Sequence, residues 1–410
     1  MKLSTSNIKF KGDKVIWIVF ILFSFISIVE VFSAMGNLVY AGDKIEDPIR
    51  LLAKHFLMLV AGFVVVYTFQ NFNYTYITKI LKPMLILSIL LLIVALGVGF
   101  FHKYVLKLSV EEDPLASGRW IPLPFGFTFQ PSEMAKYITI MFVAMQLTLF
   151  QGKLKSYETF KKILSLPFII FILILSSNIS SALILFVVIM LLLFISSVRL
   201  KYLLSTLIIM ITVLVLMFII VKAVPEISEI PPFQRFSSGN TRLQGNTSND
   251  PKHQTHITQV AIGNAGFLGL GIGNSVMANH QTEAHNDFIF MVIVEEGGFL
   301  LGFIVIMFYM ILVYRCFAIA KRAKGLFGAL VSLGIGLVFI IQALVHISVS
   351  IGIAPVTGQT LPFISKGGTS QLFACFALGV VLNISAKGEQ EDTYNNEITE
   401  ESINNTEIQM

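Results

Sequence analysis

The stretch AHNDFIFMVIVEEGG, residues 284–298, places three carboxylates in or against a run that otherwise reads as buried in a membrane. An isolated carboxylate in hydrocarbon costs roughly 3 kcal/mol on insertion scales, so chains avoid one without a reason. Asp287 stands at the start of the run. At about 1.5 Å rise per residue, Glu295 and Glu296 lie roughly 12–14 Å deeper. The stretch therefore predicts a membrane helix with one acid at its water-facing start and two deeper in the membrane.

Apolar runs of this kind recur and decide the class of the protein. The 410 residues are 55% hydrophobic and 13% charged, with a mean hydropathy of +0.80, whereas soluble proteins carry about twice that charged fraction. Ten runs are long enough, or nearly so, to span a bilayer. They lie near residues 15–36, 51–70, 81–101, 132–150, 162–177, 180–198, 203–223, 287–314, 325–350 and 368–386. We predict an all-α polytopic membrane domain of ten transmembrane helices over residues 15–386.

Basic residues gather in alternate loops and set the predicted orientation, because cytoplasmic loops carry an excess of Lys and Arg. The clusters are Lys2, Lys9, Lys11 and Lys14; Lys79 and Lys82; Lys153, Lys155, Lys161 and Lys162; Arg199 and Lys201; and Arg315, Lys321, Arg322 and Lys324. We expect both termini in the cytoplasm, with residues 1–14 as the N-terminal segment. Seven acidic residues and no Lys or Arg follow Lys387, so residues 387–410 are predicted to be a disordered acidic tail.

The longer loops fall on the opposite face, at 102–131, 224–286 and 351–367. Long structured loops on one side indicate binding or chemistry at the outer face. The basic excess is explained by the cytoplasmic loops and does not point to nucleic acid. Cys316 and Cys375 have no CxxC spacing and are interpreted as buried bystanders.

The segment FQPSEMAKY, residues 129–137, carries an acid and a base at the start of a predicted helix. Pro131 suits the first turn, where its missing N–H does no harm, and Glu133 there is favoured by the helix dipole. Lys136 follows on the same face, within reach of Glu133. Two interpretations stay open: a structural ion pair between helices, or part of a site for an anionic substrate.

Further groups of the outer loops suit phosphate. Arg119, in GRWIPL, matches bidentate phosphate contact, and Arg235 and Lys366 could add to such a clamp. Gly367 and Gly368 lie directly before the last apolar run, where unpaired N–H groups of a helix N-terminus bind anions. A simple tight turn explains the two glycines equally well.

Histidines and acids could also serve a metal or a proton transfer. His253, His256, His280 and His285 lie in the long outer loop with Asp287 nearby, but their spacing matches no closed zinc site, which favours histidines without a metal. Deep carboxylates act in proton relays or fix helix packing. We favour packing for Glu295 and Glu296, and a general base for the shallow Asp287.

Four segments resemble the SEDS (shape, elongation, division, sporulation) family of peptidoglycan polymerases. QPSEMAK is similar to the family's QPSE-x-x-K, AHNDFIFMVIVEEGGFLLG to its A-H-T-D-F-I-F…E-E-x-G, and LPFISKGGTS to its L-P-F-I-S-Y-G-G-S-S. AIGNAGFLGLGIGNS, residues 261–275, resembles the preceding glycine-rich run, and its ending is closer to the cell-division branch than to the elongation branch. The resemblance covers roughly residues 15–386.

The resemblance implies a ten-helix SEDS fold with a cavity open to the outer leaflet, and polymerisation of lipid II into glycan strands. It implies that Asp287 is the catalytic residue and that Glu133, Lys136 and Arg119 belong to the cavity. We assign a structural role around this motif to His285, Glu295 and Glu296. A class B penicillin-binding protein transpeptidase and other divisome proteins are the implied partners. The implied location is the bacterial cytoplasmic membrane, at the septum.

The sequence departs from the family pattern at several motif positions. Gln281 and Thr282 replace the usual Leu-Pro, Asn286 replaces the motif Thr, and Lys366 replaces the motif Tyr. In SNISSA, Asn178 replaces an acid, so no role is carried over to that loop.

The chemistry of the residues fits such a transfer. One base near the acceptor hydroxyl and positive charge near the departing diphosphate are needed. Asp287 would supply the base. Arg119, Lys136, Arg235 or a divalent cation such as Mg²⁺ or Mn²⁺ would supply the charge, with no organic cofactor. The alternatives are a lipid II flippase, an elongation polymerase and an inert scaffold for division proteins.

Overall fold

The computed structural model describes residues 10–36, 48–72, 74–107, 113–124, 127–223, 251–280, 284–354 and 356–407. In these ranges a long helix stands at each of the ten predicted spans. The helices are α1 (Lys14–Gly36), α2 (Pro48–Asn71), α3 (Tyr74–Phe100), α4 (Pro131–Leu149), α5 (Tyr157–Ser177), α6 (Ile179–Ile195), α7 (Leu200–Ala223), α10 (Ile289–Arg322), α11 (Leu326–Ser350) and α12 (Thr369–Glu407), with α9 (Pro251–Ala265) between α7 and α10.

Shorter elements lie in the connections. They are a π-helical turn at Phe101–Val105, 3-10 turns at Pro114–Ser117 and Met277–His280, and the antiparallel strands β1 (Ile121–Leu123) and β2 (Phe127–Phe129). The strands pair with Ile121 opposite Phe129, which brings the segment after Arg119 back to the start of α4.

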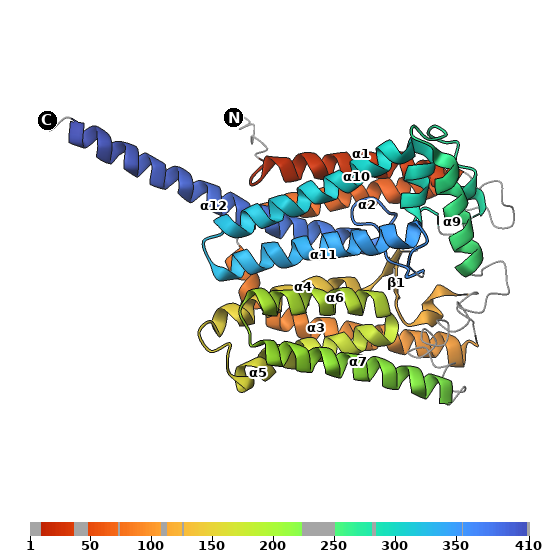
Figure 1. Cartoon of the computed structure of the whole chain (residues 1–410), viewed down its shortest axis with the longest axis horizontal. Helices are drawn as coiled ribbons and strands as arrows, with labels where there is room; N and C mark the ends of the chain where they lie inside the picture. Colours follow the sequence, from red (N-terminus) through yellow and green to blue (C-terminus); the bar gives the residue numbers. More distant parts are fainter. Residues whose placement is uncertain are drawn as a thin grey trace.

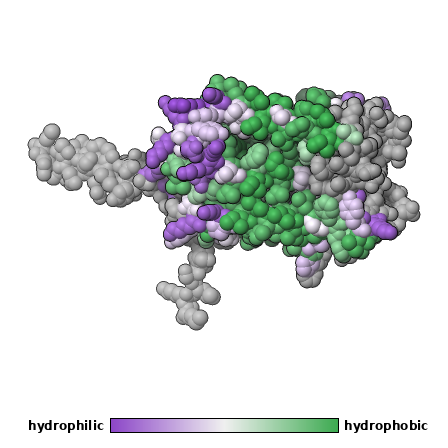
Figure 2. Space-filling model, turned by 90° about the horizontal axis from the view of Figure 1, so that it is seen from below, coloured by the Kyte–Doolittle hydropathy of each residue, from purple (hydrophilic) through white to green (hydrophobic). Residues whose placement is uncertain are grey.

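Most of the long helices have the composition of membrane spans. Within the described residues, eight are long and apolar enough to cross a bilayer. The two exceptions among the predicted spans are α6, which has 17 residues, and α4, which carries Glu133 and Lys136. A broad apolar band covers the middle of the surface in Figure 2, with hydrophilic residues gathered at one end. The count of ten spans stays a prediction.

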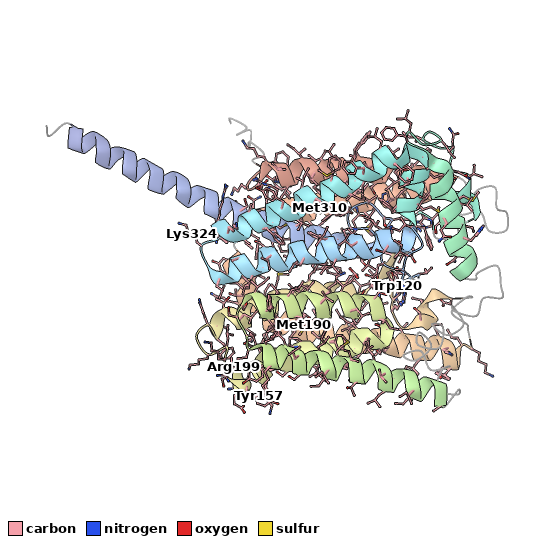
Figure 3. The ribbon with its side chains drawn as sticks, in the orientation of Figure 1. Trp120, Tyr157, Met190, Arg199, Met310 and Lys324 are labelled. Atoms are coloured by element: carbon pink, nitrogen blue, oxygen red, sulfur yellow. The ribbon has the colours of Figure 1, made fainter. Side chains whose placement is uncertain are left out.

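The two ends of the bundle differ as the charge pattern predicts. α1 begins and α12 leaves the bundle at the same end, whereas β1 and α9 lie at the other (Figure 1). Figure 3 places Arg199 and Lys324 at the first end and Trp120 toward the second. The basic loops and the long loops therefore occupy opposite ends, which we call the basic end and the loop end.

The core is centred on α4, α11 and α12. α4 is buried along nearly its whole length, and α11 and α12 are the most buried of the apolar spans. α4 packs on α3 and α11, and α12 packs on α2. α7, in contrast, touches mainly α6 and exposes most of its side chains, as a helix does when hydrocarbon rather than protein covers it.

One predicted span differs in its bounds and shape, and one extends beyond its predicted end. The predicted span 287–314 appears as α10, which starts after Asp287, breaks at Gly298 with φ +70° and continues to Arg322. Its last turn carries Lys321 and Arg322, where cations are favoured by the helix dipole. α12 extends away from the bundle to Glu407 (Figure 1), and the disorder predicted for residues 387–410 stays a prediction.

Candidate active site at the loop end

Asp287 and Arg119 meet at a glycine in the loop that follows α11. Gly358 has φ +64°, and a Cβ atom placed on it would lie 3.4 Å from Oδ2 of Asp287 and 3.6 Å from a terminal guanidinium nitrogen of Arg119. Both side chains are half-buried. Both distances are ordinary contact distances, so the positive φ, rather than a lack of room, favours glycine at this position.

Arg119 is aimed by the end of a neighbouring helix. Its Nε donates a hydrogen bond to the carbonyl oxygen of Ser177, the last residue of α5, at 2.8 Å. A cation at a helix C-terminus is favoured by the unpaired carbonyls there. Gly118, with φ +67°, ends the preceding turn. The guanidinium is thereby held at the loop end, with one terminal nitrogen beside Gly358.

Asp287 is positioned by the loop 361–366, which we call the strap. The backbone N–H of Lys366 donates to the carbonyl oxygen of His285 at 3.1 Å, and Ser365 Oγ donates to that of Asn286 at 2.8 Å. Ser27 of α1 donates to the carbonyl oxygen of Ile364 at 2.6 Å. The strap therefore fixes the two residues before Asp287 and is itself tied to α1.

His285 lies under the strap as a neutral imidazole. Burial, and then the charge of Lys366 and the neighbouring His55, lower the pKa of His285 from its ordinary 6.5 to about 3. A protonated imidazole would add a second cation beside Lys366. Its role is therefore to fill and support the motif rather than to bind an anion.

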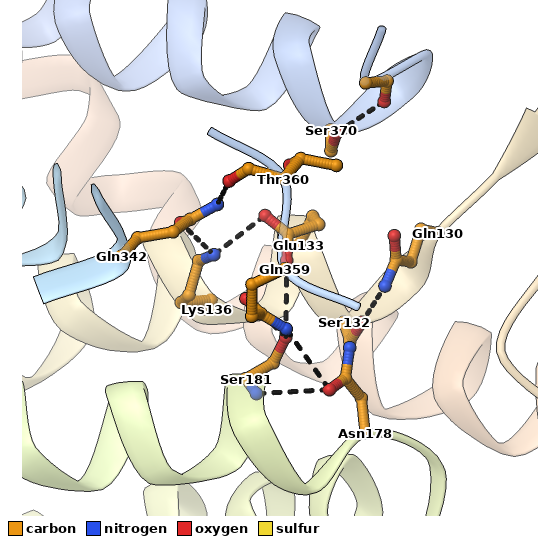
Figure 4. Close-up of polar contacts among 11 residues, drawn as sticks. Gln130, Ser132, Glu133, Lys136, Asn178, Ser181, Gln342, Gln359, Thr360 and Ser370 are labelled. Carbon is orange, nitrogen blue, oxygen red and sulfur yellow. Dashed lines mark hydrogen bonds and ion pairs between the residues drawn. The ribbon is translucent and has the colours of Figure 1, made fainter. Parts of the chain in front are cut away.

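Glu133 and Lys136 form the polar centre of the bundle (Figure 4). Lys136 is completely buried, and its Nζ lies 2.7 Å from Glu133 Oε2 and 2.9 Å from Oε1 of Gln342 on α11. Gln342 Nε2 donates in turn to the carbonyl oxygen of Thr360 at 3.0 Å. The ammonium therefore joins α4 to α11 and, through Gln342, to the chain between Gly358 and the strap.

A second polar chain links this centre to the start of α6 (Figure 4). Asn178 caps α6 by accepting from the N–H of Ser181 at 3.2 Å, and also accepts from Gln359 Nε2 at 3.3 Å. Ser181 Oγ lies 3.4 Å from Glu133 Oε1. His346 Nδ1 contacts the carbonyl oxygen of Gln359 at 2.7 Å. Gln359, next to Gly358, is thus held from both sides.

The space beside the polar centre is narrow. A cavity of about 10 Å³ is lined by Glu133, Gln342 and Gly367, among others, which is roughly the room that one water molecule needs. Gly367 and Gly368 precede the first residue of α12, Thr369, as the sequence predicts. The predicted cavity open to the outer leaflet stays a prediction, because a space of this size has room for one water molecule and not for a sugar.

Glu295 and Glu296 hold the loop 266–278, which we call the glycine loop. Glu295 Oε1 accepts from the N–H groups of Val276 and Met277 at 3.1 and 3.2 Å. Glu296 accepts from the N–H groups of Gly273 and Ser275 at 3.0 and 3.2 Å. The break at Gly298 lets the loop backbone pair with α10, with Gly271 N–H donating to the carbonyl oxygen of Glu296 at 2.9 Å.

Other residues proposed from the sequence do not join this site. Arg235 lies outside the described residues. His256 is exposed on α9, and the side chains of His253 and His280 are not described. In the described part of the chain, no three His, Cys, Asp or Glu side chains are grouped to hold a metal ion.

Residues 13–390 match the family that comprises FtsW, RodA and SpoVE, described as cell cycle proteins. The chain belongs to this family. Two relatives named probable peptidoglycan glycosyltransferase FtsW, from Trichlorobacter lovleyi and Coxiella burnetii, are each 30% identical to it. The alignments cover 91% of this chain in both cases, and 93% and 96% of the respective relatives. With its apolar helices, this FtsW/RodA/SpoVE protein is a multi-pass membrane protein.

Solved structures share its fold. A chain of a peptidoglycan synthase complex, described for its coordination of polymerisation and crosslinking, matches with a TM-score of 0.67 and 22% identity, over 92% of this chain and 99% of that one. A crystal structure of the rod shape determining protein RodA of Thermus thermophilus matches with a TM-score of 0.59 and 20% identity, over 91% of this chain and 96% of RodA.

Several buried polar residues of this FtsW/RodA/SpoVE protein were not singled out as candidates from the sequence. Gln342 and His346 lie in one apolar run four residues apart, so they share a helix face, which is a signal that could have been used. Ser27, Glu30 and Ser33 follow one another at intervals of three residues along α1, which also places them on one helix face, and all three are buried. Gln359 gave no signal, because its loop has no periodicity.

Proposed function

We propose that this protein is a peptidoglycan glycosyltransferase that polymerises lipid II into glycan strands at the outer face of the bacterial cytoplasmic membrane, during septal wall synthesis. The carrying observation is that Asp287 and Arg119 both lie beside Gly358 at the loop end. Glycosyl transfer from a diphosphate requires a base for the attacking hydroxyl and positive charge near the leaving diphosphate, and Asp287 and Arg119 are groups of these two kinds. The named activity of the FtsW relatives supports the proposal.

In this reaction a sugar hydroxyl of one lipid II attacks the anomeric carbon of another. The new carbon–oxygen bond forms as the bond to the diphosphate breaks, and the diphosphate leaves with the bonding electrons. Asp287 takes the proton of the attacking hydroxyl. Arg119, held by Ser177, stabilises the negative charge that develops on the diphosphate. One displacement without a covalent intermediate inverts the anomeric centre, as in inverting glycosidases.

A divalent cation, Mg²⁺ or Mn²⁺, would bind beside Asp287 only together with the phosphates of the substrate. Mg²⁺ is commonly bound by one or two carboxylates together with substrate phosphates rather than by an all-protein cage. Asp287, half-buried beside Arg119, is the side chain that would hold it. When bound, the cation would neutralise charge on the phosphates.

The proposed partners are a class B penicillin-binding protein and other divisome proteins. The fold match to a chain of a synthase complex that polymerises and crosslinks supports a transpeptidase partner. Polymer made by this protein would then be crosslinked by a separate chain.

The test is purified protein in detergent or vesicles, given lipid II with and without a class B penicillin-binding protein, and assayed for glycan polymer on gels. We expect polymer that depends on this protein and increases with the partner. Transfer of lipid II across vesicle membranes with no polymer in either condition would instead identify a flippase. A protein that binds its partner but neither polymerises lipid II nor transfers it across the membrane would instead be a scaffold.

A further inference from the structure

α1 carries a buried acid that the proposed reaction does not use. Glu30 is 2% exposed, and Glu296 on α10 is 1% exposed. α1 packs on α10, and Ser33, one turn of α1 beyond Glu30 and on the same helix face, donates a hydrogen bond to Glu296, which brings the two acids to the same contact between these helices. Two adjacent carboxylates in a buried, membrane-spanning region repel each other, and each lacks the water that would stabilise its charge. One of the pair must therefore carry a proton.

The hydrogen bonds distinguish the two acids. Glu296 accepts from the N–H groups of Gly273 and Ser275 and from the hydroxyl of Ser33, one turn of α1 beyond Glu30. Bonds of this kind to a carboxylate favour its ionised form. Glu30 Oε2 has no hydrogen-bond partner among the described residues. The ionised member is thus Glu296, and the proton belongs on Glu30.

We infer that Glu30 is a protonated carboxylic acid, and that this proton keeps α1 attached to the glycine loop through Ser33 and Glu296. Ionisation of Glu30 places a second negative charge beside Glu296. The pair then separates, and the contacts of Glu296 with Gly273 and Ser275 weaken. Glu30 is a positioning residue, because it acts on the loop that precedes the Asp287 segment and not on substrate.

Other titratable groups lie on the elements packed against this pair, among them Lys366 on the strap, which Ser27 of α1 contacts at Ile364. From α10, Glu295 is bound by Val276, Met277 and the Ser275 hydroxyl. From α2, His55 contacts Ser27, which lies about one turn of α1 from Glu30 on the basic-end side, at 2.9 Å between Nε2 and Oγ. The ion pairs His102–Asp113, Lys136–Glu133 and Arg315–Asp13 do not involve Glu30.

The direct test is infrared spectroscopy of the purified full chain at neutral pH. Wild type should show the carbonyl stretching band of a protonated carboxylic acid, and Glu30→Gln should lack one such band. Glu158→Gln, which changes an exposed acid of α5, should keep it. An unchanged band in Glu30→Gln would overturn the inference. So would misfolding of Glu30→Gln, because an amide differs little in shape from a protonated carboxyl group.

A second readout follows the loop itself by hydrogen–deuterium exchange of residues 266–278. We call the glycine loop closed when Glu296 binds it and open when these contacts are broken. If opening releases the proton of Glu30, the protection of the loop amides against exchange should fall by up to about tenfold per pH unit as the pH rises above neutral. Glu30→Gln should abolish that slope, and Glu158→Gln should not. An equal slope in wild type and Glu30→Gln would contradict the inference. Neither measurement depends on polymerase activity, so the outcome is separate from that of the proposed function.

Discussion

At the scale of single residues, Lys136 is a buried cation held at two points. It is fully buried against Glu133 and Gln342, a geometry that supports the structural ion pair over direct contact with diphosphate. We expect Lys136→Ala to lower the free energy of unfolding by about 3–5 kcal/mol, because it leaves the Glu133 charge buried and unpaired. Thermal unfolding in detergent measures this loss.

The matched control removes both charges together. In Glu133→Gln/Lys136→Met no buried charge is left unpaired, so most of the lost stability should return. Polymerase activity in this double variant would exclude a substrate role for the pair. A folded but inactive double variant would restore that role.

His285 gives the protein a sensitivity to acid. Its pKa of about 3 in the folded protein is below the ordinary 6.5, so the unfolded chain binds the proton first. The stabilisation is complete above about pH 6.5 and is lost as the pH falls toward 3, by at most about 1.4 kcal/mol per pH unit. Unfolding midpoints of wild type and His285→Asn across this range should converge at low pH. A parallel decline of the two proteins would contradict the assignment.

At the scale of elements, the break in α10 at Gly298 couples the helix to the glycine loop. A Cβ atom on Gly298 would overlap the carbonyl oxygen of Phe267, and its φ and ψ of +70° and −176° suit glycine almost alone. Gly298→Ala should therefore destabilise the protein by about 1–3 kcal/mol and increase exchange in residues 266–278. Gly97→Ala in α3, where a Cβ meets no atom within 4 Å, is the control and should be neutral or slightly stabilising.

The helices could be predicted because apolar runs of about 20 residues have few other solutions in a membrane. The bend at Gly298 could not, since it depends on the glycine loop lying against α10 across a long separation in sequence. Arg119 and Asp287 were singled out by residue type and motif, but Gly358, which lies beside both of them, has no local signal. Gln359 and the strap contacts likewise arise only from tertiary packing.

At the scale of the whole molecule, the separation of basic and loop ends predicts the orientation in the membrane. Gln151, between α4 and α5, and Asn274, in the glycine loop, are both exposed, at opposite ends. In intact cells an impermeant thiol reagent should label Asn274→Cys and spare Gln151→Cys, because the native Cys316 and Cys375 are buried. Labelling of Gln151→Cys alone would contradict this orientation and indicate the opposite one.

The central claim is that Asp287 takes the proton of the attacking hydroxyl at the loop end. Asp287→Asn keeps the shape of the side chain and removes the base, which should reduce the rate of polymerisation by about 10²–10⁴-fold. The variant should still insert and bind its partner. The measurement is polymer yield from lipid II with equal amounts of folded wild type, Asp287→Asn and the exposed control Glu158→Gln. A yield from Asp287→Asn close to that of the control would contradict the account.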